Sequence, residues 1–449
     1  AEWLMTGHIN EDIFSYDIKR FQKFHSELGF IKKRITESLG DLYGMHWPFK
    51  QHKTSRNIKT LPHHENLKSF GACFGVSGGY ERPMWFALDG EKAEYKYSYN
   101  YQSWYPSAEY ETNNTIKNVG LFDLTPFSKF EIKSDKAHQE LQKICTANIK
   151  NEPGKCIYTH MLNPDGGIET DLTVVCIDNN HFRIISSAAT RERDKFHIKK
   201  HLSKDIELKD ITDDLCVFGL FGPKSRDLMK AISKDNFDND DFKFGTAKFI
   251  TIEGVKIWAQ RLSYVGELGY ELYVEFKDAK KIYELIINKG KNFNLSNCGM
   301  HAMDIMRMES GFLHWGHDIS PEENQYQAGL AFTISKKKDV DFVGKKAIEK
   351  IKQENTKTRF AMFTLEDSEP GKPLLLHDEP IYIDDKIIGR STSGNYSFNF
   401  KKNLVFGYIQ NDLSNEELQS KNLFVEVEKQ KYPIFVQIQP LKRTDFKNL

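Results

Sequence analysis

Strand-like and helix-like segments alternate irregularly through the middle of the chain, and this order constrains the fold more than any other feature. Between residues 115 and 345, alternating apolar side chains predict strands at 172–177, 182–186, 247–252, 255–262 and 269–274. Helical spacing predicts helices at 134–146, 223–232, 277–289 and 300–312. Because these elements do not follow a regular βαβ order, the pattern indicates an α+β fold of mixed sheets and helices, not a doubly wound sheet.

The two ends of the chain have different patterns. After residue 355, predicted strands at 359–365, 381–388 and 404–408 are separated mainly by turns, which is typical of a small antiparallel β-barrel. Residues 15–45 place apolar side chains at helical spacing with basic residues on the other face. They therefore predict a packed helical segment with a solvated basic face, broken into two helices at Gly29. Residues 70–112, rich in aromatic residues and glycine, are interpreted as a wrapping or interdomain segment.

Charge, hydropathy and cysteine content exclude several classes of protein. The 63 basic residues balance the 63 acidic ones and are spread along the chain, which argues against a nucleic-acid partner. The apolar runs are far shorter than the roughly 20 residues of a membrane-spanning helix, and no secretion leader is visible. Six widely spaced cysteines predict reduced thiols in a cytosol-like compartment, either the cytoplasm or, in a eukaryote, the mitochondrial matrix.

Metal and nucleotide signals are weak. His314 and His317 are three residues apart and could share a metal ion on a helix, but Gly311 and Gly316 disfavour a helix there. No second ligand cluster completes four ligands, so no metal site is expected. The chain has no GxSxG nucleophile elbow and no GxGxxG loop after a strand, so neither motif predicts its chemistry here.

Asp171 follows a pair of glycines and precedes an apolar strand in the segment Gly166-Gly167-Ile168-Glu169-Thr170-Asp171. A paired-glycine turn allows the backbone to approach a ligand closely. A carboxylate at the edge of a buried strand is partly desolvated, which raises its pKa toward values useful for proton transfer or for stabilising a cation. An aspartate at this position can equally close the turn or cap backbone amides, so the residues alone leave both roles open.

Glu267 lies between two glycines in the segment Tyr264-Val265-Gly266-Glu267-Leu268-Gly269-Tyr270. The glycines predict a tight bend that holds the carboxylate at a loop tip. An ionised carboxylate accepts two parallel hydrogen bonds, which suits a planar donor edge such as that of a pterin. Tyr264 and Tyr270 could stack on such a ring. The alternative is a charged hairpin turn that binds nothing.

Several further motifs accompany these two between residues 115 and 445, and their order and spread are more specific than any one of them. They are Val119-Gly120-Leu121-Phe122-Asp123-Leu124, Leu220-Phe221-Gly222-Pro223, Met306-Arg307-Met308-Glu309, Asp341-Phe342-Val343-Gly344-Lys345 and Thr392-Ser393-Gly394-Asn395. Together they resemble the folate-binding aminomethyltransferase superfamily of the glycine-cleavage T-proteins. The resemblance implies a folate-binding, aminomethyltransferase-like domain at residues 113–350 and a C-terminal β-barrel domain at 351–449.

The N-terminal third resembles a particular branch of that superfamily, the dimethylglycine and sarcosine dehydrogenases. Ala1-Glu2-Trp3-Leu4-Met5-Thr6-Gly7 and Asp17-Ile18-Lys19-Arg20-Phe21 resemble the end of their flavin-dependent amine-oxidase portion, and Tyr80-Glu81-Arg82-Pro83 resembles the connector that follows it. This implies a helical remnant of the flavin portion at residues 1–66 and a connector at 67–112. FAD would then belong to a missing or separate N-terminal portion, because the dinucleotide loop is not in this sequence.

The resemblance also implies roles for single residues. Asp171 aligns with the acidic residue near the folate nitrogens that take up the one-carbon unit, so it is the expected catalytic residue. Glu267 aligns with the carboxylate that holds the pterin edge. Three further residues fall at positions that line the pocket: Tyr264, Thr173 and Ser187, the last in place of an asparagine common in T-proteins. Met303 stands where the T-proteins have an arginine, which fits the dehydrogenase branch.

The implied activity is tetrahydrofolate-dependent one-carbon transfer. It would form 5,10-methylene-tetrahydrofolate from the iminium or formaldehyde product of N-methyl amine oxidation, with dimethylglycine or sarcosine as the type of amine. The implied partners are that small molecule and a flavin oxidoreductase domain or subunit. Three alternatives stay open: a stand-alone aminomethyltransferase of glycine cleavage, a folate-dependent demethylase, and a non-catalytic folate-binding subunit that docks a flavoprotein.

Overall fold

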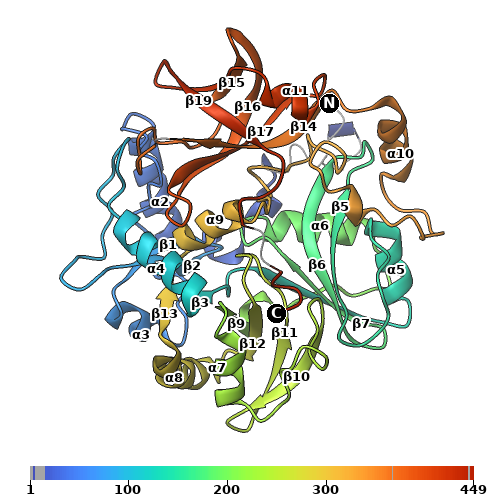
Figure 1. The fold of residues 1–449 in the computed structure, drawn as a ribbon. Helices are drawn as coiled ribbons and strands as arrows, with labels where there is room; N and C mark the ends of the chain where they lie inside the picture. The colour runs from blue at the N-terminus through green and yellow to red at the C-terminus, as the bar shows by residue number, and fades with distance from the viewer. Residues whose placement is uncertain (1–3, 6–15, 367, 443–444) are drawn as a thin grey trace.

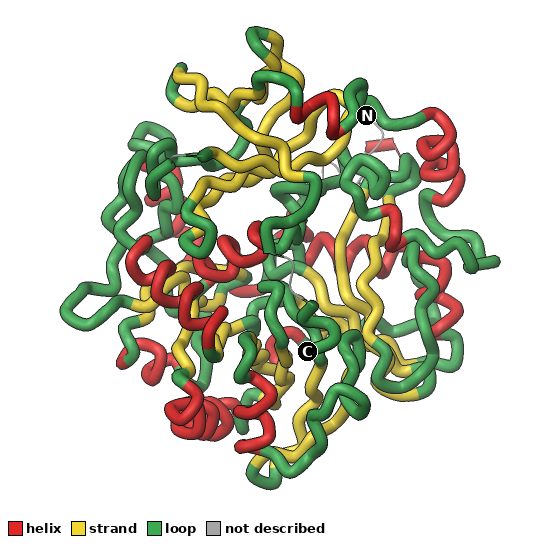
Figure 2. Tube along the Cα trace, viewed as in Figure 1, coloured by secondary structure: helices red, strands yellow, loops and turns green. Residues whose placement is uncertain are grey.

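A computed structural model of the chain describes residues 4–5, 16–366, 368–442 and 445–449. Figure 1 shows two large sheets below a β-barrel, with most helices on the outside and one helix, α9, at the centre. Figure 2 shows the strands of each layer lying together and the connecting loops on the surface. Among the described residues, no helix is long and apolar enough to span a membrane. The predicted α+β class is confirmed.

The first sheet has five antiparallel strands and carries Asp171. Its spatial order is β5 (Cys156–Leu162), β6 (Ile168–Asp178), β7 (His181–Ser186), β4 (Ser128–Lys133) and β8 (Lys209–Asp210). Two helices belong to this region of the chain, α5 (Ala137–Ile144) and α6 (Arg191–His201). The buried cluster under the sheet joins strand residues such as Phe130 and Val174 to Leu141 of α5 and Ile198 of α6.

The second sheet has six strands and precedes the central helix. Its order is β10 (Ala247–Ile252), β11 (Val255–Gln260), β12 (Gly269–Glu275), β9 (Leu215–Phe221), β3 (Val119–Asp123) and β13 (Leu295–Cys298), and only the last pair is parallel. Its helices are α4 (Tyr105–Lys117), α7 (Ser225–Ile232), α8 (Ala279–Gly290) and α9 (Met300–Glu309). A cluster with Phe122, Val175, Trp258 and Met306 joins the two sheets and α9 into one core.

The C-terminal strands close into the predicted barrel. Its order is β14 (Thr358–Leu365), β17 (Lys402–Gln410), β16 (Lys386–Ser397), β15 (Pro380–Ile383), β18 (Leu423–Val427) and β19 (Gln430–Gln437). Helix α10 (Lys345–Glu354) precedes the barrel and α11 (Asn415–Gln419) lies within it in sequence. The predicted turn at Asp384-Asp385 is confirmed, because it joins β15 to β16.

The N-terminal segment differs from its prediction. Two short 3-10 helices, η2 (Ile18–Arg20) and η3 (Lys23–Ser26), precede one helix, α2 (Leu28–Asp41). The break therefore falls at extended Glu27, and Gly29 lies inside the helix. The resembling segment at residues 1–7 lies largely outside the described residues. The connector that follows is ordered, with α3 (His64–Ser69) and a hairpin of β1 (Ala72–Ser77) and β2 (Tyr80–Phe86).

Helix α2 also presents the opposite face from the predicted one: its polar face, and not its apolar face, contacts the rest of the protein. Its polar face meets residues 53–54, because the Arg34 guanidinium donates to the Thr54 carbonyl (2.7 Å) and Glu37 accepts from the backbone N–H of Lys53 (2.6 Å). Four apolar residues of the predicted stripe instead face solvent, with Leu28 84%, Ile35 51%, Leu39 57% and Leu42 64% exposed, whereas Ile31 is half-buried. The predicted packed stripe is thus an unpartnered apolar face within the described residues.

Candidate functional site

Asp171 lies inside β6 and not before a strand, because β6 already begins at Ile168. The register pairs Asp171 with His160 and Thr173 with Tyr158 of β5. Since side chains alternate along a strand, Asp171 and Thr173 are on one face of the sheet together with Tyr158 and His160. Ser187, just after β7, is half-buried and continues that face, since Thr173 pairs with Ile185. Three of the predicted residues therefore share one surface.

The Asp171 carboxylate is poised to exchange a proton near neutral pH. Burial raises its pKa to about 6, while the hydrogen bond from the Tyr158 hydroxyl (3.1 Å) lowers it. The predicted rise is confirmed, and desolvation is its cause. Asp171 is nevertheless only half-buried and Tyr158 is 39% exposed, so a ligand can reach both groups.

A chain of hydrogen bonds runs from Asp171 into the core. The Tyr158 hydroxyl lies 3.2 Å from Nε2 of His160, and Nδ1 of His160 lies 3.0 Å from the hydroxyl of Thr333. His160 and Thr333 are buried. The sequence interpretation missed Tyr158 and His160; their only signal is the i, i+2 spacing of two ring-bearing residues before the glycine turn.

Tyr264 lies beside Asp171 and helix α9. Its ring stacks on Phe312, with centroids 5.9 Å apart and planes 18° apart, and its hydroxyl donates to the Leu313 carbonyl (2.8 Å). Burial raises the pKa of Tyr264 well above its ordinary value, and the carboxylates of Asp171 and Asp304 add to the rise. Tyr264 is half-buried, so part of its ring is open to a ligand.

Glu267 is not at an exposed loop tip. Only 4% of it is exposed, and its Oε1 lies 2.5 Å from Nζ of Lys442, which comes from the C-terminal tail. Burial raises the pKa of Glu267, and Lys442 opposes that rise. The tight bend is confirmed at Gly266, which has a φ of +67° and faces the Ser310 side chain so closely that a Cβ would lie 2.1 Å from Oγ.

Two other expectations about this region are wrong. Tyr270 cannot border a ring at the site, because it is fully buried in the core between α7 and β12 and its hydroxyl lies 3.4 Å from Arg226. The glycine pair before Asp171 brings the backbone close to the protein itself, not to a ligand. A Cβ at Gly167 would lie 1.9 Å from the Pro321 carbonyl oxygen.

Helix α9 joins the site to the barrel through a buried ionic network. The Arg307 guanidinium donates to Asp304 (2.8 Å), to Asp318 and to the Ser393 hydroxyl of β16 (2.9 Å). Asp318 is fully buried and also accepts from Thr392 (2.6 Å) and Ser393 (2.8 Å). Burial alone would raise the pKa of Asp304, but Arg307 holds it below its ordinary value.

Met303 and Asp304, neighbours on α9, have different environments. Met303, at the position of the T-protein arginine, is 1% exposed and belongs to the core between the sheets. The Asp304 side chain keeps 40% exposure although Arg307 and Asn395 both bind it. Asp304 therefore adds a second accessible carboxylate near Tyr264.

The histidine pair is close in space. The rings of His314 and His317 lie 4.7 Å apart, and burial lowers the pKa of His314 to about 4. Among the described residues, the spacing of a metal site occurs instead at Glu37, Asp41 and His52. Those carboxylates already have partners, since Lys50 binds Asp41 (2.6 Å) and backbone N–H groups bind Glu37.

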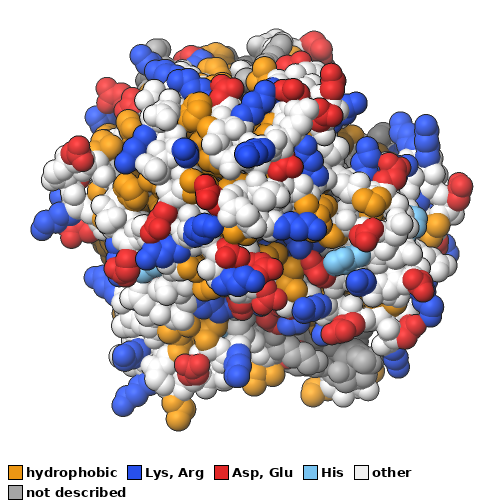
Figure 3. Space-filling model, turned by 90° about the horizontal axis from the view of Figure 1, so that it is seen from below, with side chains coloured by type: hydrophobic (Ala, Val, Ile, Leu, Met, Phe, Trp, Pro, Cys, Tyr) orange, Lys and Arg blue, Asp and Glu red, His pale blue; other side chains and the backbone are white. Residues whose placement is uncertain are grey.

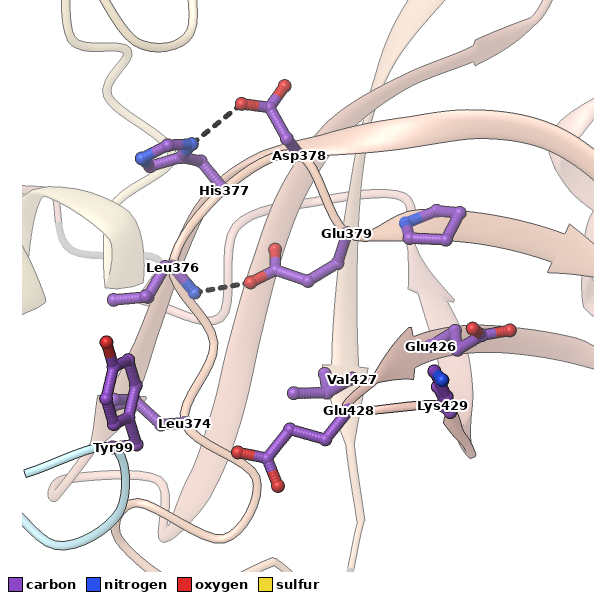
Figure 4. A pocket seen from close by; sticks show the side chains of 11 residues that line it. Tyr99, Leu374, Leu376, His377, Asp378, Glu379, Glu426, Val427, Glu428 and Lys429 are labelled. Carbon is purple, nitrogen blue, oxygen red and sulfur yellow. Dashed lines mark hydrogen bonds and ion pairs between the residues drawn. The ribbon is translucent and has the colours of Figure 1, made fainter. Parts of the chain in front are cut away.

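A hollow lies on the barrel, and none of the five predicted site residues lines it. It has a volume of about 370 Å³ and is lined by residues that include Tyr99, Glu379, Glu426 and Glu428 (Figure 4). Glu379 accepts from the Leu376 backbone N–H (2.8 Å), as Figure 4 shows. Figure 3 shows acidic and basic side chains interspersed on the face seen from below, as expected for a chain with no net charge.

Comparison with known families identifies the architecture. Residues 63–338 match the model of the GCVT N-terminal domain. The chain belongs to the glycine-cleavage T-protein family. Residues 359–441 match the T-protein C-terminal barrel domain. Residues 6–60 match the central domain of FAD-dependent oxidoreductases, so part of that architecture lies in this chain and not only in a separate portion.

The chain is also similar to individual proteins. It is 36% identical over 397 residues to 4-methylaminobutanoate oxidase (formaldehyde-forming) of Paenarthrobacter nicotinovorans, covering 88% of this chain and 48% of that protein. It is 30% identical over 450 residues to mitochondrial dimethylglycine dehydrogenase of Rattus norvegicus, covering 99% and 51%. The chain thus spans about half the length of these relatives. The fold matches aminomethyltransferase T of Bartonella henselae with a TM-score of 0.72 at 20% identity, covering 86% and 98%.

Proposed function

We propose that this chain carries out tetrahydrofolate-dependent one-carbon transfer at the surface formed by Asp171, Thr173, Ser187 and Tyr264. The proposal rests mainly on the carboxylate of Asp171, which is accessible and has a pKa of about 6. Such a group can both accept and return a proton near neutral pH. Membership of the T-protein family and the fold match to an aminomethyltransferase support folate as the ligand class.

The residues present fit a folate. Tetrahydrofolate supplies amine nitrogens that take up a one-carbon unit, and each such step requires a nearby group to hold a proton. Asp171 holds that proton at its carboxylate, while Tyr158 fixes the orientation of the carboxylate. The half-open ring of Tyr264 offers a stacking surface.

Glu267 is only 4% exposed, and its ion pair with Lys442 leaves Oε2 as the acceptor for a donor edge. A carboxylate has about four acceptor positions, and Lys442 contacts only Oε1. A planar pair of N–H donors on a pterin would bind the ionised carboxylate more strongly than it would bind a neutral acceptor, because these hydrogen bonds are charge-assisted. Lys442 fixes the carboxylate in place for that role.

The proposal also covers the source of the one-carbon unit. We infer an iminium or formaldehyde released by flavin-dependent oxidation of an N-methyl amine, since the similar proteins include a formaldehyde-forming methylamino-acid oxidase and dimethylglycine dehydrogenase. The exposed apolar residues of α2 would then pack against a flavin oxidoreductase portion, because apolar faces of this kind mark interaction sites. The compartment would be that of such enzymes, the cytoplasm or the mitochondrial matrix.

The test is the coupling of formaldehyde to tetrahydrofolate, measured as the rate above the spontaneous reaction. Asp171→Asn should lower the enzymatic rate by ~10²–10⁴-fold, the usual contribution of one general acid–base group. Asp178→Asn, at the exposed end of the same strand, is the matched control and should couple at the wild-type rate. Equal rates for Asp171→Asn and wild type would refute the assignment. With a sulfonium or methoxy compound in place of formaldehyde, a 5-methyl-tetrahydrofolate product would instead identify a folate-dependent demethylase.

A further inference from the structure

The hydrogen-bond chain behind Asp171 has one hydroxyl hydrogen for two acceptors. The Tyr158 hydroxyl lies 3.1 Å from Oδ2 of Asp171 and 3.2 Å from Nε2 of His160. A hydroxyl donates one hydrogen bond at a time. The protonation state of His160 therefore decides what Tyr158 can do for Asp171.

The surroundings of His160 fix its state. The histidine is fully buried, and burial lowers its pKa to about 3, so it is neutral at physiological pH. The Thr333 hydroxyl donates its hydrogen to the Leu330 carbonyl (2.8 Å), which leaves its oxygen to accept from Nδ1 of His160 (3.0 Å). The side-chain amide of Gln325 also lies near Nδ1, at 3.5 Å, a longer contact than that to Thr333. The shorter bond to Thr333 places the proton of the neutral ring on Nδ1, and Nε2 presents a lone pair to Tyr158.

The ionised and the protonated states of Asp171 differ in how many donors and acceptors of this hydrogen-bond chain are paired. When Asp171 is ionised, the charge-assisted bond draws the Tyr158 hydrogen to the carboxylate, and Nε2 of His160 is left as a buried acceptor without a donor. When Asp171 is protonated, its own hydrogen bonds the Tyr158 oxygen, and the Tyr158 hydrogen turns to Nε2. Every donor and acceptor in the chain is then paired.

We propose that His160 is a positioning residue for Asp171: its Nε2 receives the Tyr158 hydrogen whenever Asp171 is protonated, which stabilises the proton-loaded carboxyl. The inference rests on the proposed function of Asp171. The exchange balances, because the proton taken up by Asp171 stays on its carboxyl oxygen and the Tyr158 O–H only rotates. No covalent bond other than that to the arriving proton forms or breaks.

The other groups near Asp171 do not replace the hydrogen-bond chain through Tyr158 and His160 in controlling its protonation state. Tyr158 and His160 come from β5, and Tyr264 is the titratable group that approaches from the loop before β12. Arg307 lies beyond Tyr264 and is already bound by Asp304 and Asp318. Among the described residues, no ion pair gives Asp171 a cationic partner, so hydrogen bonding and burial set its protonation.

The experiment measures the pKa of Asp171 by infrared titration, using the carboxyl band that disappears in Asp171→Asn. His160→Leu removes the acceptor and should lower this pKa by about one unit, which is a tenfold change in the ratio of the two forms at fixed pH. Tyr158→Phe removes the donor to the carboxylate and should raise it. His160→Gln, which can both accept from Tyr158 and donate to Thr333, should restore most of the wild-type value.

Opposite shifts in the two variants are the signature of the proposed chain, because a purely structural role of His160 would not produce them. An unchanged or raised pKa in His160→Leu would overturn the proposal. If that variant does not fold, Thr333→Val replaces it: losing the Nδ1 acceptor frees the ring to protonate Nε2, and the pKa of Asp171 should again fall. The titration needs no turnover, so it can succeed even if Asp171→Asn shows that the proposed function is wrong.

Discussion

Replacing Asp318 by asparagine should weaken the attachment of the barrel to helix α9. Asp318 is fully buried and accepts hydrogen bonds from Arg307, Thr392 and Ser393 as well as from the backbone N–H of His314 (3.0 Å). Removing one partner of a buried ion pair costs about 3–5 kcal/mol, because the other charge stays desolvated. Asp304 still binds Arg307, which places the expected loss at about 3 kcal/mol, the lower end of that range.

Thermal unfolding and hydrogen exchange together measure this loss. A loss of about 3 kcal/mol corresponds to a drop in melting temperature of roughly 6–12 °C for a lobe of 150–250 residues. Exchange of backbone amides in β16 should rise with it, because asparagine has one oxygen for the four donors that the two aspartate oxygens serve. Asp378→Asn is the control, because Asp378 and Arg390 form an exposed pair worth about 0–1 kcal/mol. A melting temperature as high as that of the control would refute the reasoning.

Three further predictions concern carboxylates. Since the pKa of Asp171 is about 6, the rate of folate coupling should fall about tenfold per pH unit below pH 6 and level off above it, as a pH–rate profile would show; a flat profile would contradict the role of Asp171. Glu111→Gln should lower the free energy of unfolding in urea by about 1–3 kcal/mol, because Glu111 accepts from two backbone N–H groups (2.7 and 2.8 Å) and an amide can accept only one of them; an unchanged midpoint would count against it. Lys442→Met should cost about 3–5 kcal/mol in the same assay by leaving Glu267 buried and unpaired, and a stable variant would show that the pair is solvated.

Local signals in the sequence predicted much of the fold. The strands β10 and β11 match the prediction closely, because Glu253 and Gly254 both adopt positive φ in a two-residue hairpin turn that only a few residue types favour. Helix α9 and strand β14 were similarly predictable from their periodicity, whereas strands β18 and β19 were not predicted. The formation of these elements is determined mainly by residues that lie close together in the sequence.

The site depended on contacts that periodicity does not encode. Asp171 and Thr173 could be placed on one face by strand alternation, but their neighbours Tyr158 and His160 come from β5, whose register with β6 is set in three dimensions. Lys442 is far from Glu267 in sequence, so its ion pair could not be foreseen. The exposed apolar face of α2 was misread as packed because helical spacing does not say what covers a helix.

The most direct test of the account is calorimetric titration of tetrahydrofolate into the wild-type chain and into Glu267→Ala. We expect saturable binding by the wild type and a loss of about 10–100-fold in affinity for Glu267→Ala, which corresponds to one charge-assisted hydrogen bond of about 1.5–3 kcal/mol. Glu428→Ala, in the barrel hollow, should bind like the wild type. Absence of binding by the wild type, or equal affinity in both variants, would contradict the claim that this surface holds a folate.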